Sequence, residues 1–320
     1  MGYFNIENGT LIKFHGKEET VVILDDVTKI GDGALEGNID VVAVSIPCSV
    51  TEIGNGAFRK CPNLERVIIP NSVKHIGDYA FEKCIALSDV TLPDSITSIG
   101  KGVFNDCESL LSITIPCSVT DIGFLMFSGC GGLSHVTIPS HVTHIGAWAF
   151  QNCYNLTEVT IPCSVTDIED YAFEGCALAE VLIPCSVKNI GDSAFAACEH
   201  LENICIDEGN PHYKSIDGNL YTKDGAVLMQ YAIEKKETSF VILDGTVSVA
   251  CHAFYLSQNL TSIVIPTTVT NIDAEAFYDC ESLTDVYYEG TEEQWAALTI
   301  GSDNKPLTEA TIHYQHKAQQ

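Results

Sequence analysis

Basic residues are scarce in this chain. Its 320 residues include 16 Lys and Arg against 43 Asp and Glu, which gives a formal net charge of −27 at pH 7. So acidic a surface repels nucleic-acid phosphates and anionic lipid head groups, and we expect no nucleic-acid partner. The charge indicates solubility for a stacked β structure and favours a monomer; attraction of a basic partner or of divalent cations is the alternative.

A long apolar segment is also missing. No stretch approaches the roughly 18 apolar residues that a membrane helix needs, so we expect no membrane insertion. Residues 1–14 show no basic segment followed by an apolar one, and they therefore predict no secretory signal. Taken alone, this start favours a cytoplasmic protein, unless a targeting segment lies upstream of it.

The motifs of common enzymes and metal sites are absent. The sequence contains no G-x-S-x-G, no P-loop, no H-E-x-x-H and no C-x-x-C. His135, His141 and His144 fall on different parts of one repeat, so we interpret them as surface residues and not as converging ligands. We therefore predict a protein that is not an enzyme and that has no metal and no cofactor.

The sequence does contain one block that recurs along most of its length. The pattern I-P-x-S-V-T-x-I-G-x-x-A-F-x-x-C-x-x-L-x-x-V-x-I has a period of 23 residues, and Leu35 extends the series backwards. A period of this length is typical of a solenoid, in which each unit buries its apolar side only against its neighbours. About ten units are present, one of them a residue short at Cys176-Ala-Leu178. The aromatic anchors are Phe58, Phe81, Phe104, Phe127, Phe150, Phe173, Phe195, Phe254 and Phe277.

Each unit predicts two extended arms. Val67 and Ile69 alternate with outward-facing positions, which predicts a short strand that Pro70 ends. Residues 73–76 return apolar side chains to the core as a second segment. The apolar positions of residues 80–84 have the spacing of one helical turn. Stacked units then form a parallel β-sheet, with each anchor Phe packed between those of the units before and after it.

Most cysteines fall on two ladders. A buried cysteine behaves as a small apolar residue, so we predict reduced thiols in the core. A disulfide between Cys163 and Cys185, in neighbouring units, is the alternative. Four of the 14 cysteines follow the motif Pro, namely Cys48, Cys117, Cys163 and Cys185. Eight follow an anchor Phe by three residues, namely Cys61, Cys84, Cys107, Cys130, Cys153, Cys176, Cys198 and Cys280.

Turn and cap signals interrupt the repeats. Asp217-Gly218 and Asp224-Gly225 favour tight turns and predict a β-hairpin insertion. Tyr213-Lys-Ser-Ile216 resembles Tyr3-Phe-Asn-Ile6, which indicates that one hairpin element is used twice. The capping-box pattern Thr291-Glu-Glu-Gln294 predicts a short helix near the end. We predict an N-terminal cap hairpin over 1–20, a first repeat block over 21–207, the hairpin insertion over 208–239, a second repeat block over 240–288, and a C-terminal cap of a helix and a strand over 289–320.

The outward positions of the predicted strands form one exposed face. Thr recurs there in four consecutive units, which β propensity explains as well as binding does. The functional reading is a hydroxyl-lined, partly acidic groove on the concave side of the strands, which binds a protein or a glycan. Its predicted contact residues are Arg66, Asp89, Thr91, Ser112, Thr114, His135, Thr137, Glu158, Thr160 and Glu180.

The chain resembles the BspA-type leucine-rich repeat family. The resemblance implies a leucine-rich repeat solenoid of the α/β class, mostly β. It also implies a non-enzymatic binding or adhesion module that binds a host or microbial surface protein, or a glycan, at the bacterial cell surface or after secretion. An intracellular protein–protein interaction scaffold is the alternative. The similar features are the Asp-Gly-rich insertion, the segment Tyr288-x-Gly-Thr-Glu-Glu-Gln-Trp295 and the unit Leu64-x-x-Val67-x-Ile69-Pro70-x-Ser72-Val73-x-x-Ile76-Gly77-x-x-Ala80-Phe81-x-x-Cys84.

Overall fold

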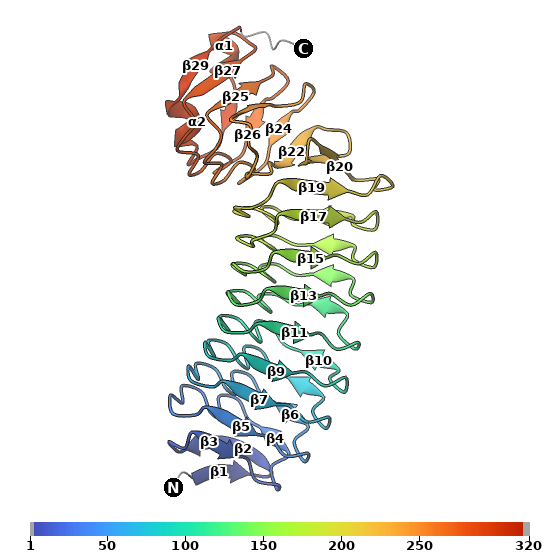
Figure 1. The fold of residues 1–320 in the computed structure, drawn as a ribbon, viewed down its shortest axis with the longest axis vertical. Coiled ribbons are helices and arrows are strands. Elements are labelled where there is room, and N and C mark those ends of the chain that lie inside the picture. Colours follow the sequence, from blue (N-terminus) through green and yellow to red (C-terminus); the bar gives the residue numbers. More distant parts are fainter. Residues whose placement is uncertain (1–2, 316–320) are drawn as a thin grey trace. The chain divides into compact units, whose positions relative to one another are not determined.

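The computed structural model describes residues 3–315 (Figure 1). The chain forms two compact units, divided between Cys176 and Ala177. The division falls in the repeat that is one residue short. Each unit is a stack of coils, which confirms the predicted mostly β solenoid. The turns number about 13, against about ten from the motif. The additional turns carry Phe14, Tyr231 and Leu307 as buried anchors in place of the motif Phe.

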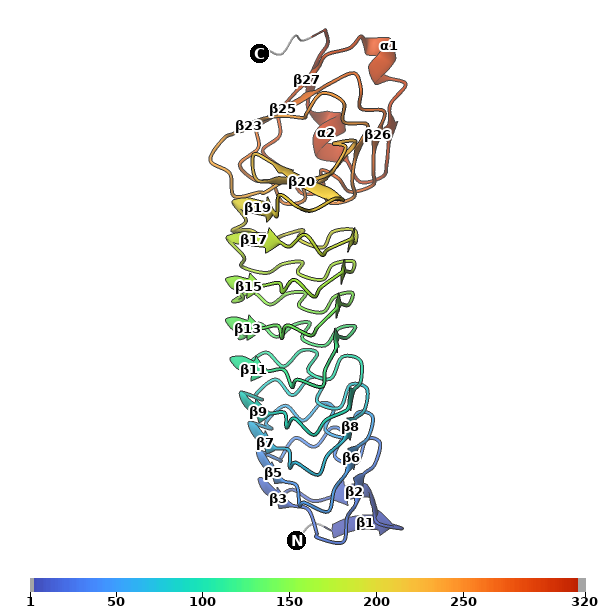
Figure 2. The same ribbon diagram turned by 90° about the vertical axis from the view of Figure 1, so that its right-hand side faces the viewer.

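The first unit contains two rows of short parallel strands. Figure 2 shows one row along one edge of the stack and the other row along the opposite edge. Val67 and its equivalents are buried in the middle of the first-row strands, whereas the residues on either side are exposed or half-buried. The first row is β3 (Thr20–Val22), β5 (Ala43–Ser45), β7 (Arg66–Ile68), β9 (Asp89–Thr91), β11 (Ser112–Thr114), β13 (His135–Thr137) and β15 (Glu158–Thr160). The second row is β4 (Lys29–Ile30), β6 (Glu52–Ile53), β8 (His75–Ile76), β10 (Ser98–Ile99), β12 (Asp121–Ile122), β14 (His144–Ile145) and β16 (Asp167–Ile168).

The arc that follows each second-row strand consists of turns. The prediction of a helical turn over residues 80–84 is therefore wrong. Tyr79 and Lys83 have φ of 56° and 59°, in the left-handed region that interrupts an α-helix, and the same pair of positions recurs along the stack. The backbone N–H groups of Tyr79, Phe81 and Lys83 donate to carbonyl oxygens of the next coil at 2.8, 2.9 and 2.8 Å. Hydrogen bonds between coils replace those within a helix.

The core of the first unit is a column of stacked rings. Phe58, Phe81, Phe104, Phe127, Phe150 and Phe173 have successive ring-centroid distances of 5.1, 5.6, 5.8, 5.4 and 5.3 Å. The buried thiols form a ladder beside this column. The Sγ of Cys107 donates to the main-chain O of Phe81, one coil earlier, at 3.3 Å, and the equivalent cysteines make the same hydrogen bond. All 14 cysteines are free. The eight that follow an anchor Phe are buried, as predicted. The prediction is wrong for the four that follow the motif Pro, because Cys48, Cys117, Cys163 and Cys185 are exposed in the turn after the strand ends.

The second unit begins with two coils and is then interrupted by an antiparallel meander. The predicted β-hairpin insertion is present as β20 (Tyr213–Ile216), β21 (Asn219–Thr222) and β22 (Val227–Gln230). The remaining strands are β17 (Glu180–Ile183), β18 (Asn189–Ile190), β19 (Asn203–Ile206), β23 (Ser239–Val241), β24 (Ser248–Val249), β25 (Ser262–Ile265), β26 (Asn271–Ile272), β27 (Asp285–Tyr288) and β28 (Thr299–Ile300). β22 pairs in parallel with β24 and so starts a new second row.

Additional elements flank the repeats at both ends. β1 (Tyr3–Glu7) and β2 (Thr10–His15) form the N-terminal hairpin. The capping box forms as predicted, because Thr291 accepts from the Gln294 N–H and the Gln294 side chain accepts from the Thr291 N–H, at the start of α1 (Glu292–Trp295). α2 (Lys305–Glu309) has no counterpart among the elements predicted from the sequence. The final strand is β29 (Thr311–His313). Residues 1–2 and 316–320 of the two predicted caps lie outside the described residues.

Candidate functional site

The predicted contact residues lie on one face of the strand rows. Every one of them is exposed, at a strand position next to the buried apolar residue that fixes the strand in the core. The alternation arises because neighbouring side chains of a strand point to opposite faces of the sheet. The core positions therefore determine the direction of these side chains, while their chemistry is free to vary.

Parallel pairing brings the contact residues into register. Arg66 of β7 lies opposite Asp89 of β9. Farther along the unit, Ser112, His135 and Glu158 lie side by side on β11, β13 and β15. The next outward position carries the hydroxyl ladder Thr114, Thr137 and Thr160. One row of the face therefore mixes charged and neutral groups, and the other carries the hydroxyl groups of Thr114, Thr137 and Thr160.

The four Thr positions do not all lie in one hydrogen-bonded sheet. Thr91 lies on β9, at the end of the sheet β3-β5-β7-β9, whereas β11 begins a separate sheet that still contacts β9. On its other side Thr91 lies opposite the exposed Ile68. Glu180 lies on β17, in the second unit, next to Asn203 of β19. The structure therefore divides the predicted residues among two sheets of the first unit and one of the second.

Hydrogen bonds on the face involve few side chains. The His135 Nε2 lies 3.2 Å from the Thr137 Oγ1, so these two groups form a polar pair on β13. Ile68 is 67% exposed and Leu182 is 59% exposed, which adds single apolar positions to a largely polar face. Such a surface can bind a partner by hydrogen bonds and charge, with scattered apolar contacts.

The histidines do not converge on a metal site. His135 is on β13, while His144 on β14 pairs with Glu169, with the Nε2 and Oε1 3.1 Å apart. Among residues 3–315, no group of three or more His, Cys, Asp or Glu side chains is arranged to hold a metal ion.

A cluster that sequence reasoning missed lies in the second unit. The His252 Nδ1 is 2.8 Å from the Ser193 Oγ and 3.3 Å from the Cys251 Sγ, and its Nε2 is 2.9 Å from the Glu275 Oε2. Ser193, His252 and Glu275 occupy equivalent positions of their arcs, with φ of 58°, 55° and 59°. In the sequence, this cluster could have been found from the fact that the three residues hold the same position of the repeat.

The order of groups in this cluster is that of a nucleophile, a base and a carboxylate. Ser193 is, however, only 4% exposed. The cavity beside it holds about 10 Å³, which is space for a single water molecule. A substrate carbonyl has no room to approach, so the cluster serves packing between arcs.

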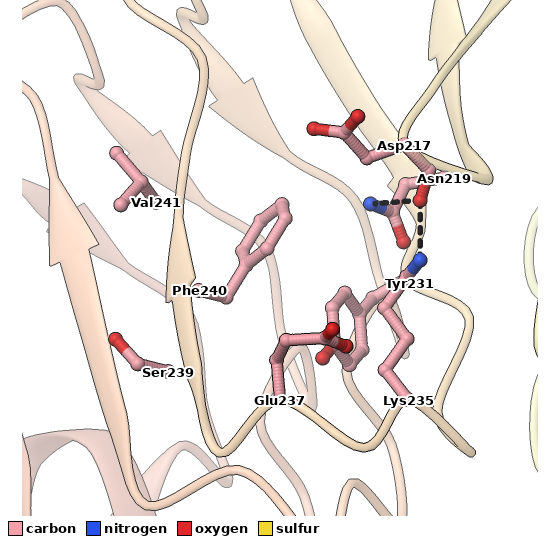
Figure 3. A pocket seen from close by; sticks show the side chains of 8 residues that line it. All are labelled: Asp217, Asn219, Tyr231, Lys235, Glu237, Ser239, Phe240 and Val241. Atoms are coloured by element: carbon pink, nitrogen blue, oxygen red, sulfur yellow. Dashed lines mark hydrogen bonds between the residues drawn. The ribbon is translucent and has the colours of Figure 1, made fainter. Parts of the chain in front are cut away.

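A larger cleft of about 420 Å³ lies beside β23 (Figure 3). Asp217 lines it, whereas Asp224 does not. The pKa of Asp224 is lowered, first by the Ala226 N–H and then by the Thr222 hydroxyl, which is turn chemistry as predicted. Burial raises the pKa of Tyr231 to about 12, so its phenol remains neutral in the cleft wall. The lining residues are Asp217, Asn219, Tyr231, Lys235, Glu237, Ser239, Phe240 and Val241.

Comparisons with known proteins agree with this architecture. The family described as BspA type Leucine rich repeat region matches residues 13–133, 122–223 and 230–296, in 6 copies. A leucine rich cell surface protein from Faecalibacterium prausnitzii A2-165 is 28% identical, with 93% of this chain and 95% of that chain covered and a TM-score of 0.55. A leucine-rich repeat protein from Bacteroides ovatus ATCC 8483 has the same fold, with 23% identity, coverage of 98% and 97%, and a TM-score of 0.59.

The comparison with curated proteins gives no match. Across the described part of the chain, no helix is long and apolar enough to cross a membrane.

Proposed function

Since the chain belongs to the BspA-type leucine-rich repeat family, we propose that it is a non-enzymatic binding module whose exposed strand face holds a protein or glycan partner. The contact surface in the first unit runs from β7 to β15, with Arg66, Asp89 and Glu158 as its charged positions and His135 next to Glu158. Glu180 on β17 marks the corresponding face of the second unit.

One observation supports this proposal above the others. The strand register holds Ser112, His135 and Glu158 side by side, although these side chains differ in charge and size. Hydrogen bonds between coils fix the backbone, and the buried residues fix the core. The exposed positions are thus free to match a partner, as residues at a protein interface do.

The proposed location is the bacterial cell surface. BspA-type proteins are surface proteins of bacteria, and the similar Faecalibacterium prausnitzii protein is described as a cell surface protein. An intracellular protein–protein interaction scaffold is the second candidate, since the same exposed strand face would serve a partner inside the producing cell.

The test is a parallel pull-down with the full chain as bait. Host extracellular matrix, serum and producer-cell lysate are the three sources of prey. Arg66→Glu, His135→Glu and Glu158→Arg each place a bulky opposite charge or a new charge on the face, and each should weaken capture about tenfold. Lys74→Glu is the matched control, because this exposed residue directly precedes β8 in the second row.

The source of the partner decides the location. Capture from matrix or serum supports the surface role, and capture from lysate alone supports the scaffold. Capture that all three face variants retain at full strength would rule out this face as the binding surface.

A further inference from the structure

One edge of a sheet in the second unit is left open. β23 pairs with β25, and β25 pairs with both β23 and β27. Within residues 3–315 no strand pairs with the other edge of β23. An unpaired edge presents N–H and C=O groups that can bond to an added strand.

The backbone groups on this edge can be assigned from their neighbours. The Thr238 O accepts from the Ser262 N at 3.1 Å, and the Ile242 N donates to the Val264 O at 3.0 Å, so both residues face β25. Successive residues of a strand point their backbone groups to opposite edges. Ser239, Phe240 and Val241 form the strand between them. It follows that the N–H and C=O groups of Ser239 and Val241 face away from β25.

The neighbouring strand edge in this unit is covered. The Ile204 N of β19 donates to the Gly218 O at 2.8 Å, and the Ile204 O accepts from the Ser215 Oγ at 2.6 Å. The β20–β21 hairpin therefore occupies the free edge of β19. It does not pair with β23, whose edge instead opens on the cleft of about 420 Å³.

The cleft contains both an apolar wall and exposed acidic groups. Figure 3 shows Phe240 on the side of β23 that faces Asp217, with Ser239 and Val241 on the other side. Asp217 and Glu237 are exposed, and both line the cleft. Lys235 is engaged, because its Nζ donates to the main-chain O of Asp217. The two carboxylates thus give the cleft a net negative charge.

We propose that an extended peptide with a basic side chain binds here, adding as a parallel or antiparallel strand to the open edge of β23. Its backbone would bond to the N–H and C=O groups of Ser239 and Val241, at the ordinary strand spacing of about 4.8 Å. A basic side chain would lie between Asp217 and Glu237, and an apolar one against Phe240. A second copy of the chain fits poorly, because each copy carries a net charge of −27. This site is separate from the strand face of the first unit.

The probe is a short fluorescent peptide in which Val and Lys alternate, titrated into the full chain. Saturable binding is expected, and the same peptide with Glu in place of Lys should bind at least about tenfold more weakly. N-methylation of every second peptide amide should abolish binding, because it removes the donors of the added strand.

Two kinds of variant locate the site. Val241→Pro removes an N–H that faces the cleft and leaves the ladder to β25 intact, and it should weaken binding about tenfold. Asp217→Lys and Glu237→Lys should each weaken it about threefold. Val22→Pro is the matched control, because Val22 holds the same position on β3, an edge strand of the first unit, and it should leave binding unchanged.

Several results would overturn the proposal. They are the absence of saturable binding, equal binding of the Lys and Glu peptides, or full binding by a Val241→Pro variant whose circular dichroism and melting match those of the parent. Self-association that Val241→Pro abolishes would instead identify a second copy as the occupant. The charge-reversal variants keep the test decisive if Val241→Pro fails to fold.

Discussion

The two units build the same coil but leave different surfaces. In residues 3–176 the coils follow one another without interruption, and the first-row strands from β11 to β15 pair on consecutive coils. In residues 177–315 the β20–β22 meander separates β17-β19 from β23-β25-β27-β29. Both units therefore have an edge strand, β3 in the first and β23 in the second, but β23 borders the acidic cleft of about 420 Å³.

The interruption repeats the start of the chain. Asn8-Gly9 turns with φ of 50° and 75°, and Asp217-Gly218 turns with φ of 49° and 75°. In both places the last strand of an antiparallel pair also pairs in parallel with the first strand of the following second row. β2 pairs in this way with β4, and β22 with β24. The insertion thus restarts the stack, and a restarted stack has a new edge strand.

The core provides the largest predicted effect. Phe127→Ala should cost about 3–5 kcal/mol, because Phe127 is fully buried between the rings of Phe104 and Phe150. Trp148 reports on the first unit and Trp295 on the second, so single-Trp variants can follow each unit in urea. The Trp148 midpoint should fall while the Trp295 midpoint stays. If the two midpoints fall together, the division into two units is wrong for folding.

The glycines at the coil corner provide a second, smaller effect. A Cβ on Gly100 would lie 2.5 Å from the Asp78 backbone N, whereas one on Gly123 would meet only the end of Met126, at 3.7 Å. Gly100→Ala should therefore cost about 1–3 kcal/mol and Gly123→Ala less than about 0.5 kcal/mol. Urea melts that follow Trp148 measure both. Equal costs would mean that the coils are not packed as closely as the structure has them.

The thiol ladder distinguishes the units in a third way. Where eight coils have a buried cysteine three residues after the anchor Phe, the coil of Phe254 has the buried Ser257. Ser257→Cys should stabilise the second unit by about 1 kcal/mol, because a thiol loses less solvation than a hydroxyl when it is buried. The midpoint that Trp295 reports should rise. Cys117→Ser, at an exposed position, is the control and should change nothing.

The smallest predicted effect concerns pH. The pKa of Asp285 is lowered, chiefly by its hydrogen bond to His313 at 2.7 Å and then by the Thr284 hydroxyl. A depressed carboxyl pKa contributes stability that is present above the unfolded pKa and is lost as the pH falls through the folded pKa. In His313→Ala the pKa of Asp285 should rise toward the ordinary value of about 3.9, as NMR titration of the carboxyl carbon would measure. An unchanged pKa would exclude His313 as the main cause.

Much of the fold could be predicted because the repeat is periodic. The anchor spacing of 23 residues identified the coil, the Phe column and the cysteine ladder. Tyr231 and Leu307 were missed as anchors because they lie in turns without the motif. The helical turn over residues 80–84 was wrong, because apolar spacing does not reveal the left-handed residues Tyr79 and Lys83.

One of the two candidate sites could be predicted from the sequence and the other could not. The exposed positions of β7 to β15 follow from strand alternation, so Arg66, His135 and Glu158 could be named in advance. Their role in binding stays a prediction. The cleft beside β23 could not be found, since it depends on which edge the β20–β21 hairpin covers. Tertiary contacts, such as the hydrogen bond from the Ile204 N to the Gly218 O, determine which strand edge the hairpin covers.

The central claim is that the restarted stack leaves β23 with an open edge, whereas β13 is paired on both sides. Residue-resolved hydrogen exchange of the full chain, followed by NMR, tests this most directly. The amides of Ser239 and Val241 should exchange much faster than those of His135, Val136 and Thr137, which lie between β11 and β15. Equal protection of the two strands would contradict the open edge and, with it, the difference between the units.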